Sequence, residues 1–304
     1  MKKLLKILFL FSGLFIFVGA VLFGIGFLGA DGRLKNLSHL TTETYAYTEK
    51  ADTEIDRVTI SYETYTRIHV QLSESATQIS VSYERLITKN GKSAGTVTLT
   101  DDNGHLQLKE TRTWKEKFRA LGWSTAKLNV NVVLPANRTY DLSIYTDTGD
   151  VILEGDTYNV SSLTIVGDTS DIYLGNTNIV CGGNVRLATD TGDIIVGNLT
   201  ANRISIETDT GDIKFFGKIS ANAIGIETDT GDVKTKGNAL LDGEIIMLET
   251  DTGDVEVKLA GGQLDYTISV DVDTGDTNVH NQLGGERKLT ISVDTGDIYV
   301  AFEQ

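Results

Sequence analysis

The sequence predicts an all-β protein: a β-solenoid (parallel β-helix-like) of about eight coils, with an irregular β N-terminal cap and one preceding transmembrane helix. Three observations support this prediction. A tetrapeptide of the form Asp-Thr-Gly-Asp recurs eight times in the C-terminal half of the 304-residue chain. Its first Asp returns at intervals of 19 to 22 residues. Each copy lies between short runs in which apolar and polar residues alternate, which is the pattern of a half-buried strand.

A repeat this regular indicates equivalent structural units. A unit of about 20 residues cannot bury its own apolar face, so each copy is expected to stack on the next. In the second copy Ser170 takes the place of glycine. That corner is therefore either distorted or holds a non-glycine residue in a left-handed conformation. The copies occupy residues 147–150, 168–171, 190–193, 209–212, 229–232, 251–254, 273–276 and 294–297.

The N-terminal segment has the pattern of a membrane anchor. Residues 1–6 form a basic leader, and residues 7–30 are 24 positions without a charge. This stretch is long enough to cross a bilayer as a helix. The lysines before it place the N-terminus in the cytoplasm and the rest of the chain outside, as a single-pass protein of the cell membrane. The alternative is a signal peptide cleaved near residues 18–20, which would leave ten more apolar residues on the mature chain.

The next two segments lead to the repeats. Residues 31–51 are polar and are expected to form a tether. Residues 52–140 are expected to form the irregular β segment, because runs such as 58–62 and 67–72 alternate apolar and polar residues. Asn103-Gly104 lies between two such runs and predicts a two-residue hairpin turn.

One short stretch within residues 52–140 breaks the β pattern and predicts a helical or loop insertion. Its apolar residues lie at helical spacing, and Gly122 would end a helix. Interleaved tryptophan and cationic side chains suit a lipid headgroup layer or an anionic glycopolymer. The alternative is a short helix that caps the open end of the β core with its aromatic side chains inward. The candidate basic-aromatic patch consists of Trp114, Lys115, Lys117, Phe118, Arg119 and Trp123.

The repeat region, residues 141–304, fits two topologies. Its frame is apolar-x-apolar-x-Thr-Asp-Thr-Gly-Asp-apolar-x-apolar, in which glycine supplies a positive φ and the first Asp closes a local hydrogen bond. Each copy is either a hairpin of a meander or one coil of a parallel solenoid. Stacked coils repeat one corner at every level, about 4.8 Å apart. A meander sends successive turns to different surroundings, so the constant corner favours the solenoid.

The charge is distributed unevenly along the chain. Residues 141–304 hold 29 acidic and 9 basic side chains, a net charge of −20, while residues 1–140 hold 13 acidic and 18 basic, a net charge of +5; together they give −15. Such an acidic repeat region argues against nucleic acid as a partner. The single cysteine, Cys181, excludes an internal disulfide and is expected to be a small buried apolar residue.

The Asp-Thr-Gly-Asp corners invite two chemical interpretations. Aspartic proteases also use Asp-Thr-Gly, but their two carboxylates share one proton, and the second Asp present in every copy would crowd such a dyad with charge. Stacked corners would instead form carboxylate ladders that a hard cation relieves. Weak Ca²⁺ binding is therefore the one cofactor considered, with candidate ligands Asp212, Asp232 and Asp254. The alternative is that one Asp of each corner accepts backbone N–H bonds and the other faces water.

Other catalytic chemistry has little support. The four histidines are scattered, and no phosphate-binding loop, dinucleotide fingerprint or nucleophile elbow is present. No catalytic residue is therefore expected. The alternative is a polysaccharide-acting enzyme, a cell-wall glycan lyase or hydrolase on a β-helix scaffold, which would need paired carboxylates facing one cleft. Glu154, Glu207 and Glu249 lie beside corners and fit ordinary solvated strand positions.

The combined pattern resembles a known family. An N-terminal membrane helix, a β segment ending in Val-Val-Leu-Pro at 132–135, and repeated Thr-Asp-Thr-Gly-Asp-Ile/Val units resemble the bacterial putative-adhesin β-strand-repeat family over about residues 55–304. The resemblance implies a β-solenoid on the extracytoplasmic face, in a domain of unknown function without catalytic residues to carry over. It also implies an association with cell-envelope stress systems. The Ser170 copy departs from the pattern.

We therefore expect a non-enzymatic, membrane-anchored extracytoplasmic protein that is adhesin-like or acts as a cell-envelope interaction or stress component. The expected partners are the membrane, through the N-terminal helix, and an envelope protein, a glycopolymer or lipid headgroups outside it.

Overall fold

The computed structural model describes residues 38–50, 54–120 and 126–303, together with isolated positions between 16 and 33. Two compact units make up the chain: residues 1–43, 85–96 and 112–127 form unit 1, and residues 44–84, 97–111 and 128–304 form unit 2. The predicted membrane span, residues 7–30, lies largely outside the described residues. Within the described part, no helix is both long and apolar enough to cross a bilayer.

Strands dominate the described residues, which confirms the all-β prediction. Within residues 38–303 of the described part, the helical elements are α3 (Trp114–Arg119) and the 3-10 turn η1 (Gln263–Asp265); the described positions between 16 and 28 are also helical. The strands are β1 (Leu40–Thr48), β2 (Arg57–Tyr62), β3 (Thr66–Ser73), β4 (Ser80–Thr88), β5 (Thr96–Asp102), β6 (His105–Thr111), β7 (Leu128–Pro135), β8 (Tyr140–Thr148), β9 (Val151–Glu154), β10 (Thr157–Thr169), β11 (Ile172–Cys181), β12 (Asn184–Thr191), β13 (Ile194–Thr210), β14 (Ile213–Phe215), β15 (Lys218–Thr230), β16 (Val233–Thr235), β17 (Leu240–Thr252), β18 (Val255–Ala260), β19 (Tyr266–Thr274), β20 (Arg287–Thr295) and β21 (Ile298–Glu303).

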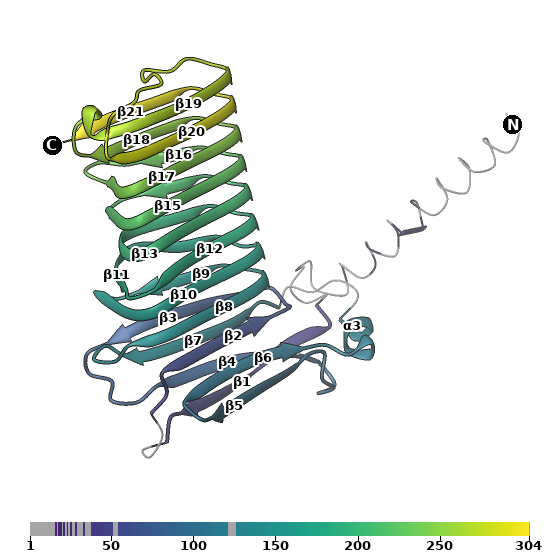
Figure 1. The fold of residues 1–304 in the computed structure, drawn as a ribbon. Helices are drawn as coiled ribbons and strands as arrows, with labels where there is room; N and C mark the ends of the chain where they lie inside the picture. Colours follow the sequence, from purple (N-terminus) through teal and green to yellow (C-terminus); the bar gives the residue numbers. More distant parts are fainter. Residues whose placement is uncertain are drawn as a thin grey trace, which may run out of the picture. The chain divides into compact units, whose positions relative to one another are not determined.

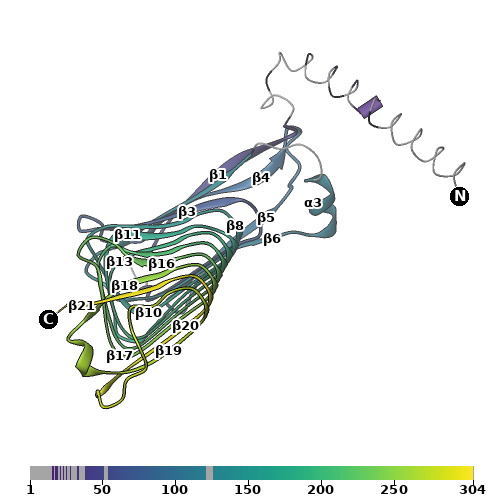
Figure 2. The same ribbon diagram turned by 90° about the horizontal axis from the view of Figure 1, so that it is seen from above.

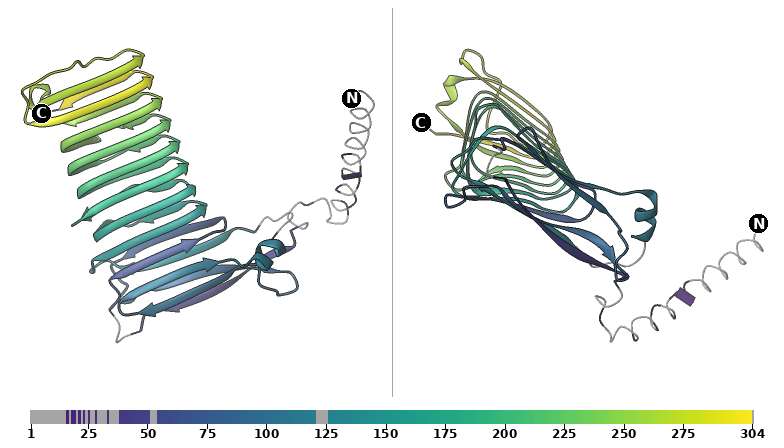
Figure 3. Two further views of the ribbon diagram at one scale, coloured as in Figure 1. Left: turned by 45° about the vertical axis from the view of Figure 1, so that its right-hand side comes forward. Right: turned by 90° about the horizontal axis from the view of Figure 1, so that it is seen from below.

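The repeats of unit 2 stack in parallel. One coil consists of a long strand, an Asp-Thr-Gly-Asp corner and a second strand beyond the corner. Ile204 of β13 pairs with Ile224 of β15, and Ile224 pairs with Ile246 of β17, always in parallel. Figures 1 and 3 show the coils lying one above another, and Figure 2 shows successive coils superposed. The parallel register confirms the solenoid and excludes the meander.

The core of the stack is a set of apolar ladders. Because side chains alternate along a strand, every second residue of each coil points inward and meets its equivalent on the next coil. Ile213, Val233 and Val255 form one such ladder, with no solvent exposure, just after the corners. Each buried aliphatic side chain contributes about 1.5–3 kcal/mol. The ladder therefore explains why seven of the eight corners are followed by Ile or Val; the seventh is followed by Thr277.

The stack continues beyond the first repeat, into the segment expected to be irregular. Strand β2 pairs in parallel with β8, and β6 pairs with the other edge of β2. On the far side of the coil, β3 lies between β9 and β7 in the same way. Strand β4 then pairs antiparallel with β7. The Asn103-Gly104 turn joins β5 to β6 with φ values of 50° and 76°, as a hairpin turn of that sequence requires.

The order of coils at the C-terminal end differs from the chain order. The sequence predicts that each copy stacks on the one before it, but β20 of the eighth copy pairs with β17 of the sixth. Strand β19 of the seventh copy pairs in parallel with the outer edge of β20. All corners offer the same hydrogen-bonding edge, so sequence similarity does not distinguish this order from the expected one. The eighth copy therefore lies between the sixth and the seventh.

A short cap covers this end of the stack. Ile268 of β19 and Gln282 exchange backbone hydrogen bonds of 2.8 and 2.9 Å. Asn278 donates from its side chain to the Val300 carbonyl at 2.9 Å, and its side-chain carbonyl oxygen accepts the Val300 N–H at 2.8 Å. The loop between the seventh and eighth copies thus occupies edges that would otherwise be open to pairing with another chain.

The segment expected to be a tether, residues 31–51, contains strand β1. Tyr45 stacks on Tyr83 with ring centroids 5.5 Å apart, and the Tyr47 hydroxyl donates to the Asp101 carboxylate at 2.6 Å. Tyr83 and Asp101 lie far from β1 in the sequence. The polar composition of residues 31–51 therefore predicted a tether and did not indicate the strand.

A buried charge fixes the end of the same segment. Glu49, with 2% exposure, accepts the backbone N–H groups of Ile55 and Ile79 at 3.1 and 2.9 Å. It also forms an ion pair with Arg138 at 2.7 Å. Every oxygen of the carboxylate therefore has a donor, which a buried charge requires.

Unit 1 contains the predicted helix, α3. Thr113 is its N-cap, and Glu116 completes a capping box in which each side chain bonds the other residue's backbone N–H. The helical spacing predicted from the aromatic residues is therefore confirmed for Trp114–Arg119. Residues 121–125, which include Trp123 of the predicted patch, lie outside the described residues.

Candidate functional site

The corner glycines are required by close packing between coils. Gly231 has a φ of 155°, and a Cβ on it would lie 1.9 Å from the Gly211 carbonyl oxygen of the preceding coil. Gly253 meets the Gly231 oxygen at the same 1.9 Å. The corner glycine therefore lets one backbone touch the next, in addition to allowing the turn.

In six of the eight corners, the second Asp accepts the backbone N–H of the second Asp in an adjacent corner of the stack. The Oδ1 atom of Asp193 accepts the Asp212 N–H at 2.9 Å, and Asp212 accepts the Asp232 N–H at 2.9 Å. Asp232 accepts the Asp254 N–H at 2.8 Å, and Asp254 accepts the Asp297 N–H at 3.0 Å. This is the hydrogen-bonded alternative considered for the corners. It removes backbone donors that the corner would otherwise leave without partners.

Lysines neutralise the other oxygen of these carboxylates. Lys214 lies 2.8 Å from Oδ2 of Asp212 and 3.2 Å from Oδ2 of Asp193, and Lys234 contacts Asp232 and Asp254. Burial opposes ionisation of Asp212, but the hydrogen bonds from Lys214 and the Asp232 N–H, together with the charges of Lys214 and Lys234, outweigh it and lower the pKa of that carboxyl. The three predicted Ca²⁺ ligands thus already have nitrogen partners. Among the described residues, no group of three or more His, Cys, Asp or Glu side chains could hold a metal ion.

A second acidic ladder is less well compensated. Glu207, Glu227 and Glu249 lie in register on adjacent strands and point outward. Arg186 pairs with Glu207 at 2.7 Å. Burial, followed by repulsion from Glu249 and Glu207, raises the pKa of Glu227. A positively charged ligand would relieve this repulsion.

An open groove lies directly beside this ladder, on the outer face of β13, β15 and β17. Its volume is about 380 Å³. A smaller hollow of about 80 Å³ shares Ser205, Gly225 and Met247 with it and is bordered by the three glutamates. Gly225 leaves the floor without a side chain, and Ile245 and Met247 border it with exposures of 49% and 48%. We call this the ladder groove; its lining residues are Arg203, Ile204, Ser205, Ala223, Ile224, Gly225, Ile245 and Met247.

The basic-aromatic patch differs from the inward-facing alternative. Trp114 and Phe118 are 73% and 70% exposed, so the aromatic side chains do not pack inward. Lys115 lies 5.6 Å from the centre of the Trp114 ring. The buried side chain of the helix is Glu116, because it accepts hydrogen bonds from Ser93 and Thr96 as well as from Thr113. Those partners decide which face of α3 turns inward, and no local sequence pattern indicates them.

The glutamates considered for an enzyme take part in ion pairs or in the acidic ladder. Glu154 contacts His69 at 2.9 Å, and Glu207 is held by Arg186. Glu249 lies in the acidic ladder, on the same face as Glu207, and both border the smaller hollow. Cys181 is buried, as expected, and burial raises the pKa of its thiol.

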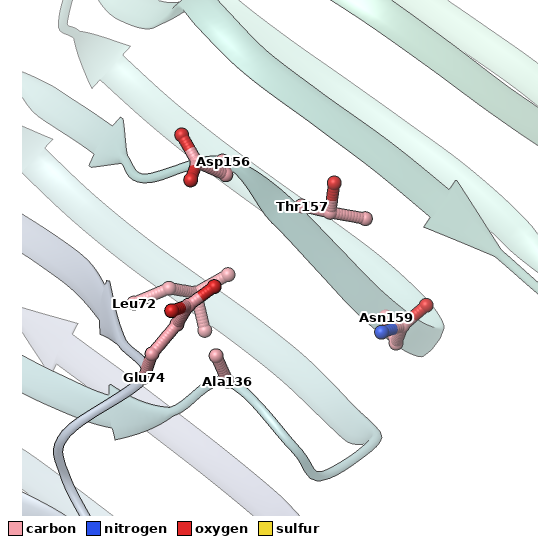
Figure 4. A pocket seen from close by; sticks show the side chains of 6 residues that line it. All are labelled: Leu72, Glu74, Ala136, Asp156, Thr157 and Asn159. Carbon is pink, nitrogen blue, oxygen red and sulfur yellow. The ribbon is translucent and has the colours of Figure 1, made fainter.

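A different pair of carboxylates was missed by the sequence analysis. Glu74 and Asp156 line a hollow of about 210 Å³. Figure 4 shows them at facing edges of it, with Thr157 and Asn159 along the strand that continues from Asp156. Glu74 follows β3 and Asp156 follows β9, and these two strands pair in parallel. Only the register of residues 57–73 with the repeats brings the two side chains together.

The Ser170 corner is explained by a compensating change. Among the described residues, Asn103 is the only non-glycine residue with a positive φ, so Ser170 is not left-handed. Its buried side chain occupies the space of the threonine that precedes the corner in other copies, such as Thr189. That position is Gly167 here, and a Cβ on Gly167 would lie 2.4 Å from Ser170 Oγ. Within this corner, Gly167 replaces the usual threonine and Ser170 replaces the usual glycine, so the volume lost at one position is filled from the other.

Together these features define the class of protein. It is an all-β repeat protein whose parallel coils stack through glycine corners and which carries a groove and an acidic ladder on one outer face. The chain belongs to the Toastrack DUF4097 family, whose model matches residues 55–303. This is a domain of unknown function with a β-repeat fold.

One solved structure shares the fold, and two more are similar at lower TM-scores. A protein from Parabacteroides distasonis described as a putative lipid binding protein is 13% identical, with 87% of this chain and 97% of that chain covered and a TM-score of 0.50. A putative adhesin from Bacteroides fragilis is 15% identical, with 86% and 97% covered and a TM-score of 0.45. A second Parabacteroides distasonis protein, a putative adhesin, is 13% identical, with 86% and 98% covered and a TM-score of 0.48. No curated protein matches the chain.

Proposed function

We propose that this chain is a single-pass membrane protein whose extracytoplasmic solenoid is a non-enzymatic, adhesin-like component of the cell envelope. In this proposal the ladder groove binds a cationic ligand that also carries apolar groups. The observation that carries the proposal is the direct contact between an apolar hollow at Gly225 and a ladder of three glutamates. The apolar border accounts for affinity, and the carboxylates account for selection of positive charge.

The anchoring part rests on the sequence of the N-terminal segment. Residues 7–30 carry no charge and follow three lysines. The described positions between 16 and 28 are helical, and Ile16 and Leu28 are among their exposed apolar side chains. Exposed apolar side chains on a helix are stable in lipid and costly in water. This supports an N-terminus in the cytoplasm and a solenoid outside.

Binding of short peptides tests the groove. We would titrate the full-length protein, held in nanodiscs of zwitterionic lipid, with the peptide Lys-Leu-Lys-Leu-Lys in a calorimeter. Lys-Ser-Lys-Ser-Lys lacks the apolar part, and Gln-Leu-Gln-Leu-Gln lacks the charge. We expect the first peptide to bind at least ten-fold more tightly than either control. Equal affinity for the charged and the neutral leucine peptides would overturn the proposal.

Filling the groove provides the matched variants. A Cβ on Gly225 meets no atom closer than 4.0 Å, so Gly225→Leu should fold and fill the hollow. Ser269 lies in the same outward row, two strands beyond Met247, and Ser269→Leu adds similar bulk outside the groove. We expect Gly225→Leu to weaken peptide binding at least ten-fold and Ser269→Leu to leave it unchanged.

One observation favours a second candidate function, a polysaccharide-acting enzyme. Glu74 and Asp156 come from neighbouring coils and line one hollow, as glycan-cleaving carboxylates must. Incubation of the full-length protein with purified cell-wall glycan, followed by an assay for new reducing ends, separates the two functions. We expect no release above that of Glu74→Gln. Release that is lost in both Glu74→Gln and Asp156→Asn would replace the non-enzymatic proposal.

A further inference from the structure

Helix α3 presents a sharply divided surface. Successive residues of an α-helix are rotated by about 100°. Trp114 and Phe118 therefore share one face, and Glu116 lies on the opposite one. Lys115 and Lys117 lie on either side of the aromatic face. All four flanking and aromatic side chains are exposed, whereas Glu116 is buried. Aromatic residues bordered by cations are typical of helices that lie in a membrane interface.

The inward face holds this orientation rigidly. Glu116 accepts hydrogen bonds from the Ser93 hydroxyl at 2.7 Å and the Thr96 hydroxyl at 2.9 Å. It also accepts the Thr113 backbone N–H at 2.9 Å. Arg119 donates from its guanidinium to the Ser93 carbonyl at 2.9 Å. The aromatic face is therefore fixed outward by the packing of the helix and does not need a partner to expose it.

Helix α3 is also hydrogen-bonded to His39, which follows closely after the uncharged N-terminal stretch. His39 donates from Nε2 to the Arg119 carbonyl at 2.7 Å, and Lys89 donates its N–H to the His39 carbonyl at 3.1 Å. Ala30 is the last residue of that stretch, and the nine residues from it to His39 span at most about 30 Å when fully extended. With residues 7–30 in a bilayer, the end of α3 that His39 contacts is held within about that distance of the bilayer surface.

The charge around the helix matches an anionic surface. Residues 112–127 hold five basic side chains and one acidic side chain, and the acidic one is the buried Glu116. The repeat region, at −20, would be repelled by the same surface. Attraction is thus confined to the segment that the chain length keeps near the membrane.

We propose that α3 docks on an anionic lipid surface, with Trp114 and Phe118 in the headgroup layer and Lys115 and Lys117 against the lipid phosphates. This inference rests on the proposed membrane anchoring. Docking of α3 would attach the chain to the membrane at a second point, in addition to the N-terminal helix. It would therefore limit the rotation of α3 about the end of that helix.

Fluorescence quenching in vesicles tests the inference. The full-length Trp123→Phe variant, which retains Trp114 as its only tryptophan, would be reconstituted in vesicles of mixed phosphatidylcholine and phosphatidylglycerol. A lipid brominated near the headgroup serves as the quencher, and flotation reports anchoring separately. We expect the protein to float and Trp114 fluorescence to fall at least two-fold relative to unbrominated vesicles. In vesicles of phosphatidylcholine alone, or with Lys115→Glu, at least half of that quenching should be lost. Lys288→Glu makes the same charge change in the repeats and should leave it intact.

Each of the other outcomes overturns the docking of α3, and one of them also overturns the anchoring. Protein that floats with unquenched Trp114 would overturn the docking and leave the anchoring in place. Protein that does not float would overturn the anchoring and the docking with it. If Trp114 is unquenched in vesicles but its emission shifts on addition of heparin, the patch binds an anionic glycopolymer, and the lipid proposal is wrong.

Discussion

Replacing Gly231 by alanine tests whether the coils are held by backbone contact at the corners. The added Cβ would lie 1.9 Å from the Gly211 oxygen, and real Cβ atoms essentially never approach closer than 3.0 Å. The two coils must then separate by about 1 Å, the difference between these distances. The bonds from Asp232 N–H to Asp212 Oδ1 and from Gly211 N–H to Thr230 O, both 2.9 Å, would stretch to about 4 Å and break.

The expected loss of stability follows from these bonds and from the backbone conformation. Each lost hydrogen bond costs about 0.5–1.5 kcal/mol, and a side chain held at an unfavourable φ costs about 1–3 kcal/mol. Gly231→Ala should therefore lower the free energy of unfolding by about 2–6 kcal/mol, and Gly231→Val by at least as much. Gly253→Ala should behave alike, because its Cβ meets the Gly231 oxygen at the same 1.9 Å.

Urea unfolding of the full-length protein in detergent, followed by far-UV circular dichroism, measures the change. Gly225→Ala is the matched control, because Gly225 lies on β15, the strand that leads into the Gly231 corner, and a Cβ there meets no atom closer than 4.0 Å. Hydrogen exchange of residues 205–260 shows whether the loss is local to the altered corner. If Gly231→Ala costs no more than about 0.5 kcal/mol beyond Gly225→Ala, backbone contact does not hold the corners and the reasoning fails.

Three further outcomes are expected. Gly167→Thr alone should destabilise the protein by about 1–3 kcal/mol, because the new side chain overpacks against Ser170. Adding Ser170→Gly should recover most of the lost stability. If urea unfolding shows that the two effects simply add, the two positions do not exchange side-chain volume. Glu49→Ala should cost about 3–5 kcal/mol, because it leaves Arg138 without its partner; thermal unfolding would show this, and a change below about 1 kcal/mol would argue against it. Hydrogen bonds from Thr113, Ser93 and Thr96 outweigh the opposing effect of burial and lower the pKa of Glu116 to about 2, so the stabilisation is present above about pH 4.5 and is lost as the pH falls towards 2. Hydrogen exchange in α3 should accelerate over that range beyond the intrinsic rate, and Glu116→Gln should remove the dependence.

Calcium addition belongs with these tests. Each predicted ligand already receives a backbone N–H and lies near a lysine. Millimolar Ca²⁺ should therefore raise the melting temperature no more than sodium chloride of equal ionic strength, which screens the same repulsion. A larger rise would show that the corner aspartates chelate the ion.

The repeats predicted the coils because the period and the apolar alternation are local properties of the sequence. The Ile or Val that follows seven of the eight corners and the glycine within seven of them were both correct indications of stacking. The order of the last coils could not be predicted in this way, because every copy presents the same edge. The coils formed by residues 57–73 were also missed, since they lack the Asp-Thr-Gly-Asp corner that identifies the others.

The candidate sites depended on information that appears only in three dimensions. Gly225 and Met247 belong to different repeats, and only their register in the sheet makes them the floor and border of one groove. The helical spacing of Trp114 and Phe118 predicted α3 but not its orientation. Hydrogen bonds to Glu116 from Ser93 and Thr96 decide that orientation. These two residues precede Glu116 by 23 and 20 positions in the sequence, so the helical pattern does not indicate them.

The position of the eighth copy between the sixth and the seventh sets an order of events during synthesis. Because the chain is made from its N-terminus, the first six copies can stack one after another. Strand β19 emerges next, but the edge it finally pairs with belongs to β20, which comes later. The final segment, from β20 to the end of β21, must therefore arrive before the end of the solenoid can close. A chain released early would keep β17 and β18 open at their outer edges, so an incomplete product would differ from a finished one in a feature that proteases and chaperones recognise.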